Sequence, residues 1–271
     1  MTLVSTDWVE KNINNIKIID CSWHMPNVNR DGYKEYLEAH IQNAVFFDLD
    51  KNSNQMTDLP HMLTTSSDWE KIVSKMGISK DDEIVVYDNS DVLSSCRCWY
   101  NFIYFGHNDK LIHVLNGGLK KWKSENKPTT SIITKINPTK YTSSERKNLV
   151  KNKSEINENI NSEKFKVIDA RSKERFEGKV KEPRKGLRSG SIPKSMCIPF
   201  GNLINDDNTF KNENEILNIF KNTLGEEITT NIVFSCGSGV TASVLALAYS
   251  LINNKYMPTI YDGSWAEYGK N

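Results

Sequence analysis

The sequence lacks an excess of charge of either sign. Its 35 Lys and Arg residues nearly balance 34 Asp and Glu residues, for a formal net charge of +1, so neither a basic nucleic-acid-binding surface nor an acidic disordered chain is indicated. No run reaches the roughly 18 uncharged apolar residues that a membrane-spanning helix needs. The opening residues, MTLVSTDWVEKN, show no basic stretch followed by an apolar one, so no secretion signal is predicted. We therefore expect a cytoplasmic protein whose partners include neither nucleic acid nor a membrane.

Cysteine is scarce and scattered. The five cysteines are Cys21, Cys96, Cys98, Cys197 and Cys236, an odd number spread along 271 residues. This distribution is typical of free thiols in a reducing compartment rather than of a disulfide framework. A zinc site needs clustered ligands at characteristic spacing, and the close pair Cys96 and Cys98 has no second pair nearby. We therefore expect no metal.

Short apolar runs are present, and they indicate buried strands. They are IKIID (16–20), DEIVVYD (82–88), FKVIDA (165–170) and NIVFS (231–235), with helical patterns between them. Continuous apolar runs of this length are typical of parallel strands covered on both faces by crossover helices. The predicted fold class is therefore α/β.

The early and late parts of the chain repeat the same elements in the same order. IIDCS is echoed by VIDARS, EAHIQNAVFFDL by RSGSIPKSMCIPF, and VLNGGLKKW by IYDGSWAEY. Such repetition indicates two tandem copies of one domain, for which the length is sufficient. The polar segment between them carries two prolines and few core residues. We predict a first domain at 1–125, a linker at 126–150 and a second domain at 151–271.

One cysteine stands in a turn between an apolar run and a helical pattern, in the stretch NIVFSCGSGVTASVLALAYSLI. A strand that ends in a tight turn before a helix directs several backbone N–H groups at one point, where the helix adds partial positive charge. Gly237 and Gly239 are expected to let the backbone curl, because glycine tolerates positive φ. Such a cradle favours the thiolate form of Cys236, which is a nucleophile. A buried structural thiol is the better interpretation for Cys21 and Cys197.

The loop CGSGVTA resembles the active-site loop of the 3-mercaptopyruvate sulfurtransferases, a family within the rhodanese superfamily. IIDCSWHMPN, HIQNAVFFDLD, VIDARSKERFEG, EPRKGLRSGSIPKS and IYDGSWAEY extend the resemblance along nearly the whole chain. It implies two tandem rhodanese-like domains, each a parallel sheet flanked by helices, with an inactive first copy and a catalytic second copy. It also implies that Gly237, Gly239, Val240 and Thr241 line the substrate loop and that no cofactor is needed.

The resemblance implies roles for residues outside the loop. Arginine in EPRKGLRSG would bind the substrate carboxylate, which suits a planar guanidinium, so Arg184 and Arg188 are candidates; solvated loop charges are the alternative. Asp50 and His61 would approach Ser238 to form a serine–histidine–aspartate relay, and a structural histidine is the alternative. The chain departs from the usual GHIPG turn of the family, since Ser191 replaces the histidine and Lys194 the last glycine.

The expected reaction is sulfur transfer through a persulfide on Cys236. The donor would be 3-mercaptopyruvate, the product pyruvate, and the acceptor cyanide, a small thiol or a thioredoxin-like protein. Thiosulfate-using relatives typically carry two basic residues after the cysteine, where this chain has Gly237 and Ser238. A thiosulfate sulfurtransferase and a sulfur-carrier module loaded by a desulfurase remain alternatives. A cysteine phosphatase is disfavoured, because its phosphate-binding arginine would fall at Ala242.

Overall fold

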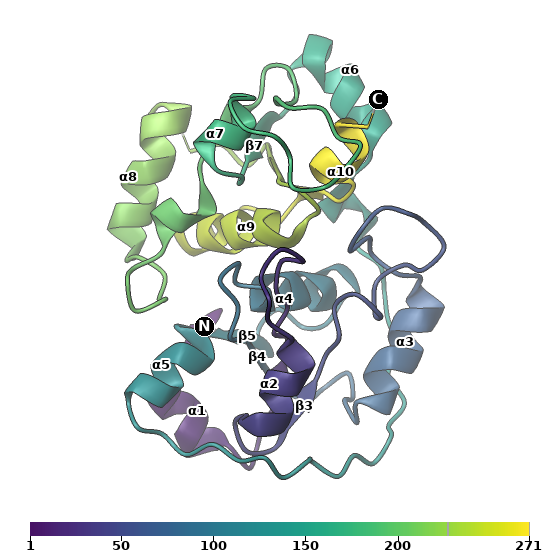
Figure 1. Ribbon diagram of the computed structural model, residues 1–271, viewed down its shortest axis with the longest axis vertical. Coiled ribbons are helices and arrows are strands. Elements are labelled where there is room, and N and C mark those ends of the chain that lie inside the picture. The colour runs from purple at the N-terminus through teal and green to yellow at the C-terminus, as the bar shows by residue number, and fades with distance from the viewer. Residues whose placement is uncertain (227, 271) are drawn as a thin grey trace. The chain divides into compact units, whose positions relative to one another are not determined.

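The structure is a computed structural model, and it describes residues 1–226 and 228–270. The chain forms two compact units. The first comprises Met1–Gln55, Leu63–Arg146 and Asp206–Thr209, and the second comprises Met56–Met62, Lys147–Asn205 and Phe210–Asn271. Each contains a five-stranded sheet (Figure 1). The short segment Met56–Met62 thus groups with the second unit.

The first unit alternates strands and helices. Its elements are β1 (Leu3–Val4), α1 (Thr6–Asn12), β2 (Lys17–Asp20), α2 (Gly32–Glu38), β3 (Ala44–Phe46), α3 (Ser66–Lys75), β4 (Ile84–Tyr87), α4 (Ser95–Tyr104), β5 (Ile112–Leu115) and α5 (Gly118–Ser124). The strand order is β1-β5-β4-β2-β3, and every pairing is parallel.

The second unit repeats this plan. Its elements are η1 (Lys147–Leu149), β6 (Val150–Lys151), α6 (Lys153–Ser162), β7 (Lys166–Asp169), α7 (Lys173–Phe176), β8 (Met196–Cys197), η2 (Phe200–Leu203), α8 (Glu213–Leu224), β9 (Ile232–Ser235), α9 (Val240–Ile252), β10 (Ile260–Tyr261) and α10 (Ser264–Tyr268). The order β6-β10-β9-β7-β8, again parallel, is the order of the first sheet. The predicted class of two parallel-sheet α/β domains is confirmed.

Helices cover both faces of the second sheet, which is why successive residues in the middle of its strands are apolar. On β9, Val233 packs in a cluster with Ile156 of α6 and Trp265 of α10. The next residue, Phe234, lies against Phe220 of α8 and, beyond it, Tyr249 of α9. Successive strand residues point to opposite faces, so both must be apolar when both faces are covered. Because all strands of this sheet are parallel, their carboxyl ends lie at the same edge, where the following loops meet.

The segment predicted to be a linker lies along the first unit. Thr130 and His40 exchange two backbone hydrogen bonds of 2.9 Å each, and Thr139 N–H donates to the carbonyl of Ser74 at 2.9 Å. Tyr141 is buried. Residues 126–146 therefore pack along the surface of the first unit. The domain limits at 125 and 151 stay a prediction.

The turn that departs from GHIPG keeps the backbone of a glycine turn. Lys194, which replaces the last glycine, has φ 61°, and Asn43 has φ 66° at the matching place of the first unit. This left-handed conformation is one that glycine adopts without cost, whereas other residues are strained in it by roughly 1–2 kcal/mol. The turn therefore retains its form, and the Lys194 ammonium pairs with Glu163 at 2.5 Å.

Candidate active site

Cys236 lies in the turn between β9 and α9, at the carboxyl edge of the second sheet. Its side chain is buried, with a relative exposure of 2%. Gly239 ends the turn at φ 80° and caps α9, which begins with Val240 and Thr241. The predicted strand, turn and helix are all present around the cysteine. The amino end of a 13-residue helix therefore faces the same turn as the thiol.

The turn is held from behind by α10. Trp265 N–H donates to the Cys236 carbonyl, and Ala266 N–H donates to the Gly237 carbonyl, both at 2.9 Å. A trans peptide bond places N–H and C=O on opposite sides, so the N–H groups of Gly237 and Ser238 point away from α10. Two backbone donors are thus directed to the open side of the turn, as a site for a negatively charged sulfur requires.

Ser264 supports the backbone of Cys236 directly. Its hydroxyl accepts the Cys236 N–H at 3.1 Å and donates to the Tyr261 carbonyl at 2.9 Å. It is fully buried and adopts φ 47°. A residue keeps such a strained backbone conformation where surrounding contacts impose it. For Ser264, one of these contacts is the hydrogen bond to the Cys236 N–H. Sequence reasoning did not single out Ser264, although it lies in the repeated IYDGSWAEY motif.

Two arginines lie against Gly237. A Cβ atom on Gly237 would lie 3.3 Å from Arg175 Nη2 and 3.4 Å from Arg184 Nη1. The expectation that Gly237 serves a positive φ is wrong, since the left-handed glycine of the turn is Gly239. Gly237 instead provides space for the two guanidinium groups. Arg184 was predicted; Arg175 of α7 was missed, although it lies within the motif VIDARSKERFEG.

Ser238 joins the second arginine to the predicted histidine. Its Oγ lies 2.9 Å from His61 Nδ1, and Arg184 Nη2 donates to the same oxygen at 3.2 Å. Ser238 and His61 are both buried. Because the hydroxyl accepts from Arg184, its own proton is available for a neutral His61 Nδ1. The two residues are 177 positions apart in sequence and belong to the same unit.

Two other predicted residues have different surroundings. Asp50 lies in the first unit, where its Oδ2 accepts from Trp23 Nε1 at 2.9 Å. Arg188 belongs to the loop before β8, and its side chain packs against α10. Its guanidinium is 4.8 Å from the ring centroid of Trp265 and 5.4 Å from that of Tyr268. Its Nη2 also donates to the Tyr268 carbonyl at 3.3 Å. The roles predicted for Asp50 and Arg188 stay predictions.

The comparisons with known proteins agree with this geometry. The family described as "Rhodanese-like domain" matches residues 5–125 and again residues 152–271. The chain belongs to the rhodanese family. The resemblance predicted from the active-site loop is thereby confirmed, and each of the two units carries one rhodanese copy.

Named relatives extend over nearly the whole chain. "Thiosulfate/3-mercaptopyruvate sulfurtransferase 1, mitochondrial" of Arabidopsis thaliana is 38% identical over 98% of this chain and 75% of its own length. The "3-mercaptopyruvate sulfurtransferase" of Mus musculus is 34% identical over 98% of this chain and 91% of its own. The crystal structure of SseA from Escherichia coli, described with the 3-mercaptopyruvate sulfotransferases, matches with a TM-score of 0.86 and 29% identity, covering 98% of this chain and 99% of that one.

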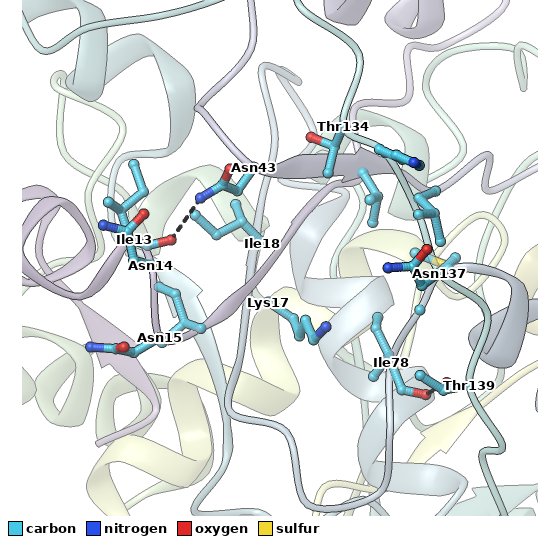
Figure 2. A pocket seen from close by; sticks show the side chains of 16 residues that line it. Ile13, Asn14, Asn15, Lys17, Ile18, Asn43, Ile78, Thr134, Asn137 and Thr139 are labelled. Carbon is cyan, nitrogen blue, oxygen red and sulfur yellow. Dashed lines mark hydrogen bonds between the residues drawn. The ribbon is translucent and has the colours of Figure 1, made fainter.

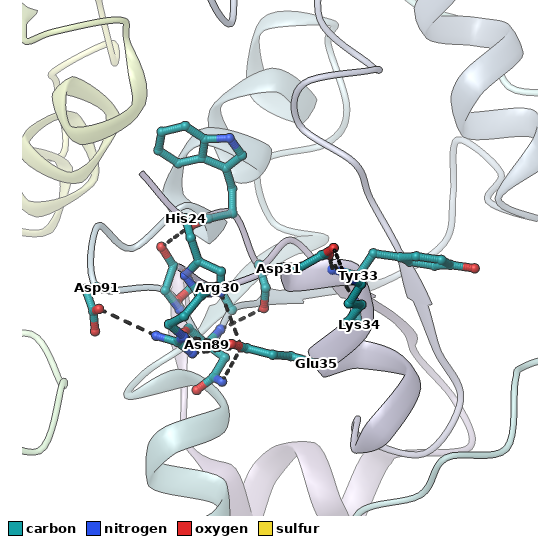
Figure 3. A network of polar contacts seen from close by, with 12 residues as sticks. His24, Arg30, Asp31, Tyr33, Lys34, Glu35, Asn89 and Asp91 are labelled. Atoms are coloured by element: carbon teal, nitrogen blue, oxygen red, sulfur yellow. Dashed lines mark hydrogen bonds and ion pairs between the residues drawn. The ribbon is translucent and has the colours of Figure 1, made fainter. Parts of the chain in front are cut away.

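The first rhodanese copy has a carboxylate instead of a thiol at the matching turn. Asp88 stands where the second copy has Cys236, and Leu119 N–H donates to its carbonyl at 2.8 Å, as Trp265 does to Cys236. The following loop is tied to α2 by ion pairs and hydrogen bonds (Figure 3), in which Glu35 binds Arg30 at 2.7 Å and Asn89 at 2.8 Å. The two copies therefore share the backbone contact at this turn, whereas only the second has a thiol at this position.

Three of the other thiols are less suited to nucleophilic chemistry. Burial raises the pKa of Cys21 and of Cys96 well above the usual thiol value. Burial and the nearby Asp169 carboxylate raise the pKa of Cys197 to about 12. A thiol that keeps its proton at neutral pH is a poor nucleophile. Cys236 differs from these three in its position, because it lies in the turn that faces the amino end of α9.

A hollow of about 430 Å³ lies elsewhere, in the first rhodanese copy (Figure 2). It opens where β2 and β3 begin, between Asn43 on one side and Thr134 and Asn137 of the connecting segment on the other. Its lining is apolar side chains, amides, hydroxyls and two lysines, and contains no cysteine, histidine or carboxylate. Its lining shows no counterpart of the Cys236 turn with its thiol, arginines and histidine, so its size does not make it the candidate active site.

Two findings concern the described residues as a whole. No group of three or more His, Cys, Asp or Glu side chains in 1–226 and 228–270 is arranged to hold a metal ion. Over the same residues, none of the helices has both the length and the apolar character to cross a bilayer.

Proposed function

We propose that this protein is a sulfurtransferase that takes sulfur from 3-mercaptopyruvate through a persulfide on Cys236. The single observation that carries the proposal is the turn itself. A buried thiol, two outward N–H groups and the start of α9 meet there, with Arg175 and Arg184 at the edge. The printed names of the Arabidopsis and mouse relatives support the donor and the reaction class.

In the first step the Cys236 thiolate attacks the sulfur of the donor. The new S–S bond forms as the donor's C–S bond breaks, and the electron pair of that bond leaves on carbon as the pyruvate enolate. The enolate then takes up a proton to give pyruvate. The thiol sulfur is oxidised to sulfane sulfur while the carbon is reduced, so no external oxidant or cofactor takes part. The outer sulfur of the persulfide would lie among the N–H groups of the turn.

The arginines give the donor its orientation. Mercaptopyruvate carries one carboxylate, and a guanidinium binds a carboxylate through two parallel hydrogen bonds. Arg184, which also contacts Ser238 at 3.2 Å, and Arg175 are close enough to Gly237 to hold that carboxylate beside the thiol. For Arg188, stacked on Trp265, a direct substrate contact remains a prediction from the family resemblance.

Ser238 and His61 are the proposed proton path. In this path the Ser238 hydroxyl gives its proton to the enolate carbon, and a protonated His61 returns a proton to the Ser238 oxygen across the 2.9 Å contact, which leaves the imidazole neutral. Asp50 is proposed as the carboxylate that holds the histidine tautomer, as the family resemblance implies. The sulfur acceptor is proposed to be a small thiol or a thioredoxin-like protein, and the cytoplasmic location stays a prediction, since one relative is named as mitochondrial.

Thiosulfate is the alternative donor, favoured by the double name of the Arabidopsis relative. The test is a comparison of catalytic efficiency with both donors at one acceptor concentration. We expect 3-mercaptopyruvate to be preferred, because thiosulfate is a dianion and the residues after the cysteine, Gly237 and Ser238, carry no charge. Mass spectrometry of the donor-treated protein should show one added sulfur, absent from Cys236→Ser. An added sulfur on Cys96 or Cys98, or turnover that survives Cys236→Ser, contradicts the proposal.

A further inference from the structure

A buried carboxylate stands behind Arg175. Glu182 lies in the loop between α7 and β8, and its side chain is 1% exposed. Its Oε2 accepts from Arg175 Nη2 at 2.6 Å, and its Oε1 accepts from Arg175 Nε at 3.1 Å. This is a two-point contact along one edge of the guanidinium. The direction of the Arg175 side chain is therefore determined by Glu182.

Glu182 is itself anchored from the sheet. Its Oε1 also accepts from Arg171 Nη1 at 2.9 Å, and Arg171 makes three hydrogen bonds of 2.7–3.1 Å to Asp169 at the end of β7. The Arg171 guanidinium lies 4.5 Å from the ring centroid of Trp265, whose N–H holds the Cys236 carbonyl. A continuous buried chain of contacts thus connects the nucleophile's turn to Arg175 through Glu182.

The same contact also determines charge at the turn. Arg175 Nη2, which bonds to Glu182, is the atom that lies 3.3 Å from the Cβ position of Gly237. The negative charge of Glu182 therefore offsets the positive charge of Arg175 at the donor-binding edge. Because the pair is largely shielded from water, this offset is screened less than that of a surface pair. The donor-binding side of the turn therefore has two oriented guanidinium groups, but its net positive charge is smaller than that of two unpaired arginines.

We propose that Glu182 is a positioning and specificity-determining residue, which sets Arg175 for a carboxylate and lowers the affinity of the site for a dianion. This inference rests on the proposed sulfurtransferase function. Binding of a monoanionic keto acid depends more on a correctly oriented guanidinium than on excess positive charge. The affinity for dianionic thiosulfate, in contrast, rises with each uncompensated positive charge. Glu182 contacts no donor atom and acts through Arg175.

The test compares Glu182→Gln, Glu182→Asp and the control Glu177→Gln, whose carboxylate pairs with exposed Lys179 at 2.6 Å. The catalytic efficiency and the KM of each variant are measured with 3-mercaptopyruvate and with thiosulfate. For Glu182→Gln we expect KM for 3-mercaptopyruvate to rise by about tenfold with a smaller change in kcat, as loss of an oriented charge-assisted contact predicts. The efficiency ratio of thiosulfate to 3-mercaptopyruvate should rise at least fivefold and should fall back at high salt.

The controls separate this inference from its premises. Glu182→Asp, which keeps the charge, should keep the wild-type donor ratio even if KM rises, and Glu177→Gln should match wild type in both. Equal losses with both donors, or a lower thiosulfate ratio, would overturn the specificity role. If Glu182→Gln fails to fold, Arg175→Lys replaces it: this variant keeps the charge without the fork, and an unchanged KM for 3-mercaptopyruvate would overturn the positioning role. If wild-type protein forms no persulfide with either donor, the proposed function itself fails, whatever the variants do.

Discussion

Asp20 and Asp169 end matching strands of the two copies, and their surroundings predict opposite responses to mutation. Asp169 is paired with Arg171, whereas the matching position in the first copy is Ser22, whose N–H and hydroxyl donate to Asp20 at 2.9 and 2.5 Å. Burial therefore raises the pKa of Asp20 from 3.8 to about 6. One pH unit is worth about 1.4 kcal/mol, so folding is about 3 kcal/mol less favourable with Asp20 ionised than with Asp20 protonated.

The sign follows from proton binding. Between about pH 4 and pH 6 the folded protein holds a proton on Asp20 that the unfolded chain has released, so this contribution to the free energy of unfolding is complete below pH 4 and is lost as pH rises through about 6. Asp20→Asn keeps an acceptor for both Ser22 donors and removes the charge. It should gain stability relative to wild type as pH rises, with a difference between pH 4.5 and pH 7.5 of at most about 3 kcal/mol.

Urea denaturation of wild type and Asp20→Asn at both pH values measures this difference, provided that unfolding of the first copy is resolved from that of the second. Asp169→Asn is the matched control. It deprives buried Arg171 of its bidentate partner and should destabilise the protein at pH 7.5. The argument is refuted if the stability of Asp20→Asn relative to wild type is the same at the two pH values.

Two further predictions concern the turn. Arg184→Ala should lower catalytic efficiency with 3-mercaptopyruvate by about ten- to a hundredfold, since a charge-assisted contact is worth about 1.5–3 kcal/mol. Sulfur release from pre-loaded persulfide protein should change much less, and equal losses in both half-reactions would mean that Arg184 serves the loop's structure. Gly237→Ala should raise KM for the donor with little effect on melting temperature, because its Cβ would displace the two arginines. Gly239→Ala should instead cost about 1–2 kcal/mol of stability, because φ is 80° there; the opposite pattern in the two variants would contradict the assigned roles.

The duplicated α/β fold was determined by the sequence itself, and so was the position of the one cysteine proposed as nucleophile. Strands buried on both faces carry near-continuous apolar runs, so 165–170 and 231–235 are recognisable as strands without any tertiary contact. The repeated strand–turn–helix pattern identifies the two copies, and only the second carries a thiol in its turn. Lys194 shows the limit of such reading: a turn that ordinarily uses glycine keeps its conformation with a lysine at φ 61°, because the surrounding chain imposes it.

The tertiary structure alone decided what surrounds Cys236. Arg175, Glu182 and Ser264 belong to three separate loops and helices, and their convergence depends on side-chain direction, which sequence spacing does not encode. The contact between His61 and Ser238 spans 177 residues, a distance at which local patterns carry no information about proximity. The role of Gly237 was misjudged for the same reason: the turn suggested a positive φ there, whereas the residue lies against two guanidinium groups that come from elsewhere in the fold.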